Sequence, residues 1–466
     1  MSTATPTRPS EVEETESLGT QIRRAMSGNF RQYGMLIALL ALVLLFQVLT
    51  NGLFLDPRNV TSLLVQNGYI LILAIGMVMV IIAGHIDLSV GSVCAFVGAT
   101  VALSMQRWDF PWPAAILLGI AMGILVGVWQ GYWVAYVGIP AFIVTLAGML
   151  LFRGLDLMIL NAQSIPVPDA FQKIANGYIP DLGPNTGYHN PTIILTLLGI
   201  AALVYFELRK RAEAKKYGME VGPMVISVIK LVLIGALLLV FGLLLASYKG
   251  VPVVGLILFA LIIAYTFITQ RTVLGRHIYA VGGNANAARL SGVDTKKVDF
   301  FVMVNMGLLA GVAGMVFTAY LNAANPKDGV GFELDAIAAV FIGGAAVAGG
   351  VGTVTGSMIG GMVMGVLNLG LANMSADSNV IQIIKGLVLL GAVAFDVRSK
   401  AQGKPSFIGL ILSRLGGGRP GAVAASGAGA AEVAESEAQA AQGTPVDDLG
   451  VDVIRTSDTT RDPSQL

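Results

Sequence analysis

Long apolar runs without charged residues alternate with short polar segments along most of the chain. Charge-free runs cover 60–83, 110–152, 250–270, 300–326 and 336–376. A helix needs about 20 apolar residues to cross the hydrocarbon core of a bilayer, so each run is long enough for at least one crossing. The pattern predicts an all-α, polytopic membrane protein.

Turn residues divide the longest runs into separate segments. Gly138–Ile139–Pro140 is a natural turn inside 110–152, and two glycine clusters, at 343–344 and 349–352, divide 336–376. About ten to twelve transmembrane segments follow, and some of them are expected to be broken or half-helices. We expect segments at 33–50, 60–83, 88–105, 113–137, 140–160, 191–206, 223–247, 252–269, 299–321, 334–348, 351–373 and 379–396.

The distribution of Lys and Arg predicts that both termini are cytoplasmic. With the amino terminus inside, the cytoplasmic stretches carry thirteen basic residues, and the opposite loops up to Gly250 carry four. The membrane domain is then 33–397, preceded by a cytoplasmic segment at 1–32. The remaining 398–466, rich in Ala, Gly and Ser, is predicted to be a cytoplasmic, low-complexity, disordered tail.

Composition narrows the function classes. The chain is 55% hydrophobic and 12% charged, about half the charged content of soluble domains. A net charge of +1 gives no basic surface for nucleic acid, and a single cysteine excludes a disulfide scaffold. The three histidines are scattered, and no phosphate-loop motif occurs. We expect no metal site, no cofactor bound by this chain and no enzymatic activity of its own.

Gly84-His85-Ile86-Asp87-Leu88-Ser89-Val90-Gly91 places polar residues and glycines between two apolar runs. Freed backbone groups at membrane depth are tolerated where they line protein or water, and transporters often hold substrate at such breaks. A short cytoplasmic turn, with Ser89 capping the next helix, explains the same residues equally well. Both interpretations stay open.

Two other features carry charge into or beside the membrane. Arg153 and Asp156 are three residues apart, on one helix face inside the fifth segment, and are expected to pair. A structural pair near the outer interface is favoured over a transport role.

In the loop 271–297, Asn284 can cap a short helix over 285–290 that Gly292 ends. Such a helix is a docking element for another protein; the alternative is an ordinary basic loop.

These residues resemble the membrane permease subunits of bacterial ATP-binding cassette (ABC) monosaccharide importers, of the xylose, multiple-sugar and ribose type. The resemblance covers about 60–397 and follows the order of the motifs. The matching stretches are Ile86–Ser92, Phe142–Met149 with Phe152-Arg153-Gly154, Gly275–Gly292, Glu333–Ala339, Gly343-Gly344 and Ala348–Gly352. An extra basic stretch and hydrophobic segment at about 207–248 favour the xylose and multiple-sugar group.

The resemblance implies a division of labour. Two permease copies form the pore in the inner membrane, a cytoplasmic ABC ATPase hydrolyses ATP, and a periplasmic sugar-binding protein delivers the substrate. The residues that we expect to make polar contacts near the path or at its gates are Asn67, Asp87, Ser89, Asp335 and Asn368. The residues expected to couple to the ATPase are Gly275, Arg276, Asn284, Ala287, Ala288, Arg289, Ser291 and Gly292.

Two alternatives to a monosaccharide importer remain. A permease of the same family could serve another small polar solute, such as a nucleoside or an autoinducer. A secondary transporter driven by protons through Asp87 or Asp335 is the other, and it predicts uptake without an ATPase.

Overall fold

The computed structural model describes residues 30–184, 186–219 and 224–401 and is almost entirely helical there. Within these ranges, nine helical segments are long and apolar enough to cross a membrane, and α2 and α16 contain shorter apolar stretches. The long helices are α2 (Phe30–Leu49), α3 (Pro57–Ile82), α4 (Val90–Arg107), α5 (Trp112–Tyr132), α6 (Ala141–Leu160), α8 (Asn190–Lys216), α9 (Met224–Ala246), α10 (Val253–Arg271), α13 (Thr295–Leu321), α15 (Val354–Asn373) and α16 (Ser378–Ala401). The prediction of a polytopic all-α protein is confirmed.

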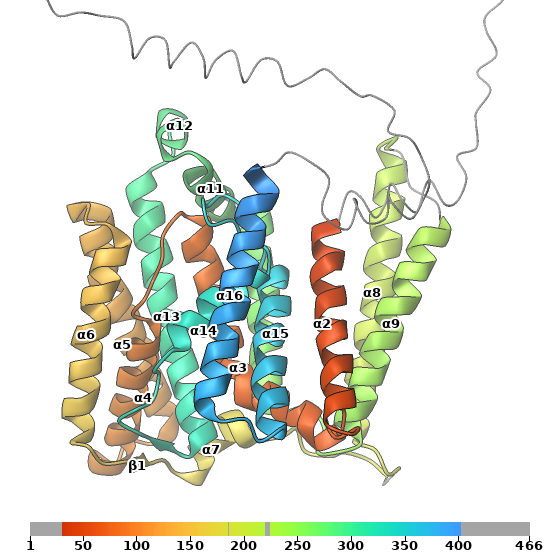
Figure 1. Ribbon diagram of the computed structural model, residues 1–466, viewed down its shortest axis with the longest axis horizontal. Coiled ribbons are helices and arrows are strands. Elements are labelled where there is room, and N and C mark those ends of the chain that lie inside the picture. The colour runs from red at the N-terminus through yellow and green to blue at the C-terminus, as the bar shows by residue number, and fades with distance from the viewer. Residues whose placement is uncertain (1–29, 185, 220–223, 402–466) are drawn as a thin grey trace, which may run out of the picture. The chain divides into compact units, whose positions relative to one another are not determined.

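Helix α13 lies at the centre of the bundle, and α3, α4 and α5 pack around it (Figure 1). Its interface with α5 is made of glycines. A Cβ at Gly123 would lie 2.6 Å from the carbonyl oxygen of Gly307, and one at Gly127 would lie 2.7 Å from the Cα of Val304. The backbones therefore touch, as the glycine repeat in α5 predicts for a packing face.

One crossing is broken. After α13 the chain forms a two-residue strand, β2 (Ala323–Ala324), paired antiparallel with β1 (Ile165–Pro166). Residues 325–331 then lead, without a regular helix, into α14 (Phe332–Ile342). Eleven residues of α-helix span only about 16 Å, half of a bilayer core. The segment expected at 334–348 is thus a half-helix, which begins two residues earlier and ends six residues earlier than predicted.

Some elements differ from the sequence prediction. Helix α8 continues to Lys216, beyond the predicted end at 206, because its Ala-, Lys- and Glu-rich continuation favours helix outside the membrane. The prediction also lacked the amphipathic α7 (Asp169–Asn176) and α11 (Val273–Gly283), which are too short for spans. A π-helical turn, η1 (Trp133–Val137), precedes Gly138, whose left-handed φ of 84° makes the expected turn.

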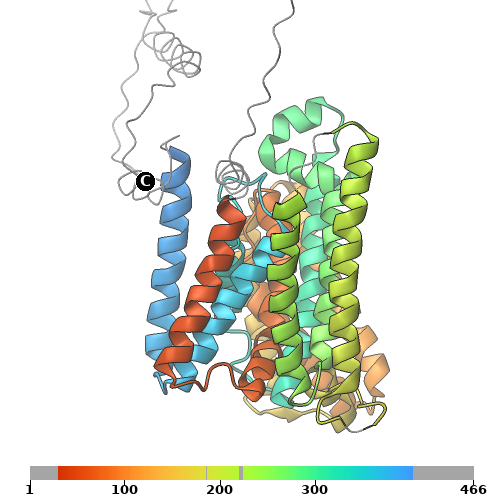
Figure 2. The ribbon, with the colours of Figure 1, turned by 90° about the vertical axis from the view of Figure 1, so that its right-hand side faces the viewer.

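The start of α2 and the end of α16 lie at the same end of the bundle as α11 and the short α12 (Ala285–Leu290) (Figures 1 and 2). A chain whose two ends lie on the same side of the membrane crosses it an even number of times. The predictions for 1–29 and for the tail beyond 401 lie outside the described residues. Which end faces the cytoplasm stays a prediction from the basic residues.

Candidate translocation path and coupling surface

Two polar side chains of the break between α3 and α4 are buried against other helices. Asp87 and Ser89 are 1% and 0% exposed. The Asp87 carboxylate accepts hydrogen bonds from the Ser89 amide (2.7 Å) and the Ser89 hydroxyl (2.6 Å). Ser89 occupies the N-cap position of α4 without capping it through its side chain, so the capping part of the simple-turn interpretation is wrong.

Neighbouring helices complete this network. Gln130 of α5 donates its side-chain amide to the Ser89 hydroxyl (2.6 Å), and Thr145 of α6 donates to the Ile86 carbonyl (3.3 Å). His85 Nε2 lies 3.0 Å from Asp299 Oδ1 near the start of α13. The break therefore ties α3 and α4 to α5, α6 and α13. The sequence already gives a signal for Gln130: it is a polar residue inside an apolar span, and such a side chain needs a hydrogen-bond partner there.

Asn67 and Asn368 bridge two helices. The Asn368 amide donates to Asn67 Oδ1 (3.4 Å), and the Asn67 amide donates to the Leu63 carbonyl (3.0 Å). Asn67 is 3% exposed. Their observed contacts join α15 to α3, and polar side chains inside apolar spans commonly hydrogen-bond across helices in this way.

Asp335 of α14 forms an ion pair with Lys385 of α16. The Lys385 ammonium lies 2.8 Å from the carboxylate, and Asp335 is 6% exposed. Lys385 was not among the predicted site residues, although a lysine inside a predicted span signals the need for an acidic partner. The pair joins the half-helix to the last crossing.

We expect Asp335→Asn alone to lower the thermal stability of the purified protein, because it leaves the partly buried Lys385 charge without its partner. Breaking one side of a fully buried pair costs about 3–5 kcal/mol, and the loss is expected to be smaller here because the Lys385 side chain is 21% exposed. The double variant Asp335→Asn with Lys385→Met should recover most of that loss. Melting in detergent, followed by size-exclusion fluorescence, measures both; a double variant no more stable than the single one would contradict the pairing.

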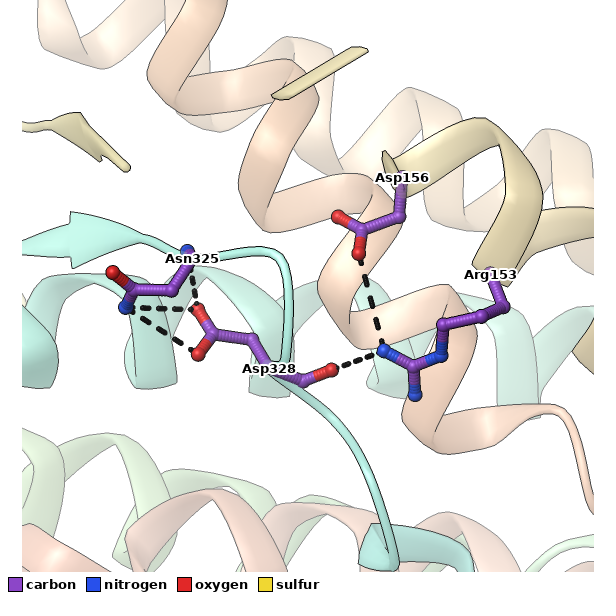
Figure 3. Close-up of polar contacts among 4 residues, drawn as sticks. All are labelled: Arg153, Asp156, Asn325 and Asp328. Atoms are coloured by element: carbon purple, nitrogen blue, oxygen red, sulfur yellow. Dashed lines mark hydrogen bonds and ion pairs between the residues drawn. The ribbon is translucent and has the colours of Figure 1, made fainter. Parts of the chain in front are cut away.

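Arg153 and Asp156 link α6 to the broken crossing (Figure 3). Arg153 Nη1 lies 3.9 Å from Asp156 Oδ2 and donates a hydrogen bond to the carbonyl oxygen of Asp328. The Asp328 carboxylate in turn accepts from the Asn325 amide (2.8 Å). The predicted pair is present, and in addition its arginine holds the 325–331 segment.

The short helix expected at the coupling loop is present as α12. The Asn284 side chain accepts from the Ala287 amide (2.9 Å), Ser291 follows as C-cap, and Gly292 has a left-handed φ of 86°. Arg289 is exposed and Ala288 is buried. Leu290, which the sequence prediction did not single out, is 87% exposed.

Asp294 stabilises the start of α13 just beyond α12. Its carboxylate accepts a hydrogen bond from the Lys297 amide (3.1 Å), and the Lys297 ammonium lies 3.1 Å away. These contacts, the amide first, hold the pKa of Asp294 below its ordinary value. The cap is therefore ionised at neutral pH, and it fixes the end of the loop that carries α12.

Helix α11 connects α12 to the broken elements of the bundle. Gly275 packs on the backbone of α10, beside exposed Arg276. A Cβ at Gly282 would collide with the carbonyl oxygen of Ile82, the acceptor of a hydrogen bond from the Gly350 amide (2.8 Å). The Tyr279 hydroxyl donates to the Gly352 carbonyl (2.7 Å). Helix α11 thus contacts both the end of α3 and the α14–α15 loop.

In the described part of the chain, no group of three or more His, Cys, Asp or Glu residues is arranged to hold a metal ion. The polar groups of the bundle instead tie helices together at two breaks, beneath a short exposed helix at one end.

Comparison with known proteins agrees with this arrangement. Residues 59–393 match the family model described as the branched-chain amino acid transport system / permease component. The chain belongs to this permease family. The xylose transport system permease protein XylH of Haemophilus influenzae is 38% identical over 375 residues, covering 80% of this chain and 98% of the relative. No solved structure matches.

Two further relatives extend the comparison. XylH of Escherichia coli K12 is 38% identical over 400 residues, covering 84% of this chain and 98% of the relative. The ribose import permease protein RbsC of the same organism is 33% identical over 361 residues, covering 78% and 92%. The resemblance to permeases seen in the sequence is confirmed, and this protein is a multi-pass membrane permease.

Proposed function

We propose that this permease is the membrane subunit of an ATP-driven importer that carries a monosaccharide, xylose or a related pentose or hexose, across the bacterial inner membrane. The observation that carries the proposal is the 38% identity to XylH proteins over 98% of their length. The exposed, capped α12 supports it, because a subunit powered by a separate ATPase needs a docking element.

Transport would proceed by alternating access. Two copies form the pore, a periplasmic binding protein delivers the sugar, and a cytoplasmic ABC ATPase pulls on α12 through nucleotide-dependent closure. Because α11 bears on Ile82 and Gly350, this pull reaches the non-helical segments 84–89 and 343–353. Rigid-body movement about such breaks is a common switching mechanism. A neutral sugar needs only weak, replaceable hydrogen bonds in the path.

A proton-driven mechanism is less consistent with the contacts. Asp335 is held by Lys385, and the Asp87 carboxylate is occupied by Ser89. A proton-carrying acid must exchange with water on each side in turn, whereas both groups are buried. Cells that keep high ATP while an uncoupler collapses the proton gradient should therefore retain sugar uptake. Loss of uptake under these conditions would favour the secondary transporter.

The docking role of α12 gives a separate test. Arg289→Glu places a negative charge on the exposed face of α12, so we expect the ATPase to copurify at least about tenfold less, since a desolvated charge at an interface costs 2–5 kcal/mol. Lys296→Glu, which reverses an exposed charge at the start of α13, is the control and should copurify normally. Normal copurification and uptake in Arg289→Glu would exclude this docking mode.

A nucleoside or another small polar solute remains the second candidate within the same family. Competition separates the two: an excess of unlabelled xylose should block uptake of a labelled pentose, and an excess of a nucleoside should not. The opposite pattern would assign the nucleoside.

A further inference from the structure

Three charged side chains gather on one face of the protein at membrane depth. Arg153 of α6, Asp328 of the 325–331 segment and Glu333 of α14 are all partly exposed, and the Arg153 side chain is 23% exposed. Arg153 lies twelve residues into the twenty-residue α6, about 18 Å from its start and about 10 Å from its end. Arg153 therefore lies within the length of this span, nearer its Leu160 end.

Lipid is an unfavourable neighbour for such a face. A charged side chain at the membrane centre costs about 2.5–3.5 kcal/mol on insertion scales, and intramembrane charges accordingly face a bundle interior or a water-filled cavity. The backbone gives the same indication, because 325–331 is irregular, and irregular backbone at depth occurs where it lines protein or water. The face that carries Arg153 is thus turned to water or to another subunit.

The contacts of Arg153 leave part of its hydrogen-bonding capacity free. Its guanidinium has five N–H donors. Figure 3 shows Nη1 directed to the Asp328 carbonyl and to Asp156, with no further contact to the residues drawn. Asp156 lies behind it with a fully buried side chain, and neither of its carboxylate oxygens has a hydrogen-bond partner. Arg153 is held from behind while the donors on its exposed side can meet a ligand.

The surrounding charges select the chemistry of that ligand. The carboxylates of Asp156 and Glu333 lie near one guanidinium. Asp328 reaches Arg153 through its backbone carbonyl, and its carboxylate is turned to Asn325 (Figure 3). A Cβ at Gly91 would collide with the Glu333 carboxylate, which places that acid at the start of α4. This is no site for an anion, because acids outnumber the arginine. Hydroxyl groups can accept from the guanidinium and donate to a carboxylate at the same time.

We infer that Arg153 and Glu333 form a binding step for an uncharged polyhydroxy solute on the translocation path, with Asp328 and Asp156 orienting the arginine. The inference rests on the proposed function and extends it, because it gives this arginine a transport role beyond the structural pair with Asp156. The guanidinium donates to sugar hydroxyls, and the Glu333 carboxylate accepts from them. The bonds are few, so the solute can leave.

Cysteine accessibility tests this inference. The sequence contains one cysteine, Cys94, which is buried, so Cys94→Ala gives a cysteine-free background. In that background we expect Arg153→Cys, in the complete importer in proteoliposomes, to react with the hydrophilic reagent 2-sulfonatoethyl methanethiosulfonate. Leu151→Cys is the matched control. Leu151 is exposed on another flank of α6 and should react at least about tenfold more slowly, since a lipid-facing thiol is not ionised.

Xylose delivered by the binding protein should slow labelling of a second variant, Val330→Cys, by at least about threefold, because a bound solute excludes the reagent. Val330 is 65% exposed in the same segment, and this variant leaves Arg153 in place. Labelling of Arg153→Cys no faster than that of Leu151→Cys, or labelling of Val330→Cys that a sugar taken up by the same proteoliposomes leaves unchanged, would overturn the inference. Uptake of labelled xylose, measured in these proteoliposomes, shows separately whether the importer carries xylose.

Discussion

Gly282→Ala is expected to abolish most ATP-driven sugar uptake while the protein still inserts and folds. The new methyl group would collide with the Ile82 carbonyl and lie 2.8 Å from the Gly350 amide, so α11 must move away from both breaks. Overpacking of this kind costs about 1–3 kcal/mol, and each 1.4 kcal/mol corresponds to about tenfold in rate. Uptake should fall roughly tenfold or more, with ATP hydrolysis no longer stimulated normally by the loaded binding protein.

The neighbouring glycine is a closely matched control. A Cβ at Gly283 meets nothing within 4 Å, so Gly283→Ala adds the same methyl group one residue away without a collision. Its uptake should stay within about twofold of wild type, as for most substitutions away from packed contacts. Equal uptake by the two variants would show that α11 does not transmit the movement through Ile82 and Gly350.

Leu290→Ser is expected to weaken assembly with the ATPase by about tenfold to a hundredfold. Leu290 is 87% exposed on α12, at the far end of the bundle. Burying a leucine in a partner contributes about 1.5–3 kcal/mol, which the serine would remove. The affinity of the purified permease for its ATPase, measured by biolayer interferometry in detergent, checks the change directly.

Met219→Ser controls for the loss of any exposed apolar side chain. Met219 follows α8, is 57% exposed and lies outside α12. The variant should bind the ATPase with wild-type affinity. If Met219→Ser weakens binding as much as Leu290→Ser does, the ATPase contacts a broader surface than α12.

Hydropathy predicted the spans well. In a membrane helix the backbone N–H and C=O groups hydrogen-bond to one another within the helix, so the length and apolarity of a segment nearly suffice to identify it as a span. The same rule explains the errors. Helix α8 extends to Lys216 in a polar, helix-favouring sequence that hydropathy treats as loop, and α11 is too short to register as a span. The glycines of α5 recur every four residues, and this spacing correctly indicated that α5 packs closely against another helix.

Side-chain partners were harder to predict. Arg153 and Asp156 are three residues apart on one helix, and their proximity follows from helical geometry alone. The partner of Arg153 in the broken crossing, Asp328, is 175 residues away, and Lys385 is 50 residues from Asp335. No periodicity connects such positions, because the fold alone determines which half-helix lies beside which span. For the same reason, nothing in the sequence indicated that Asn67 and Asn368 contact each other.

The central claim is that this permease does no work of its own and is driven by a separate ATPase at the α12 end. Reconstitution tests it most directly. Proteoliposomes containing the permease, with the binding protein and xylose outside and ATP inside, should accumulate sugar above the external concentration only when the ATPase is also present. Accumulation against the gradient by the permease alone would contradict the account.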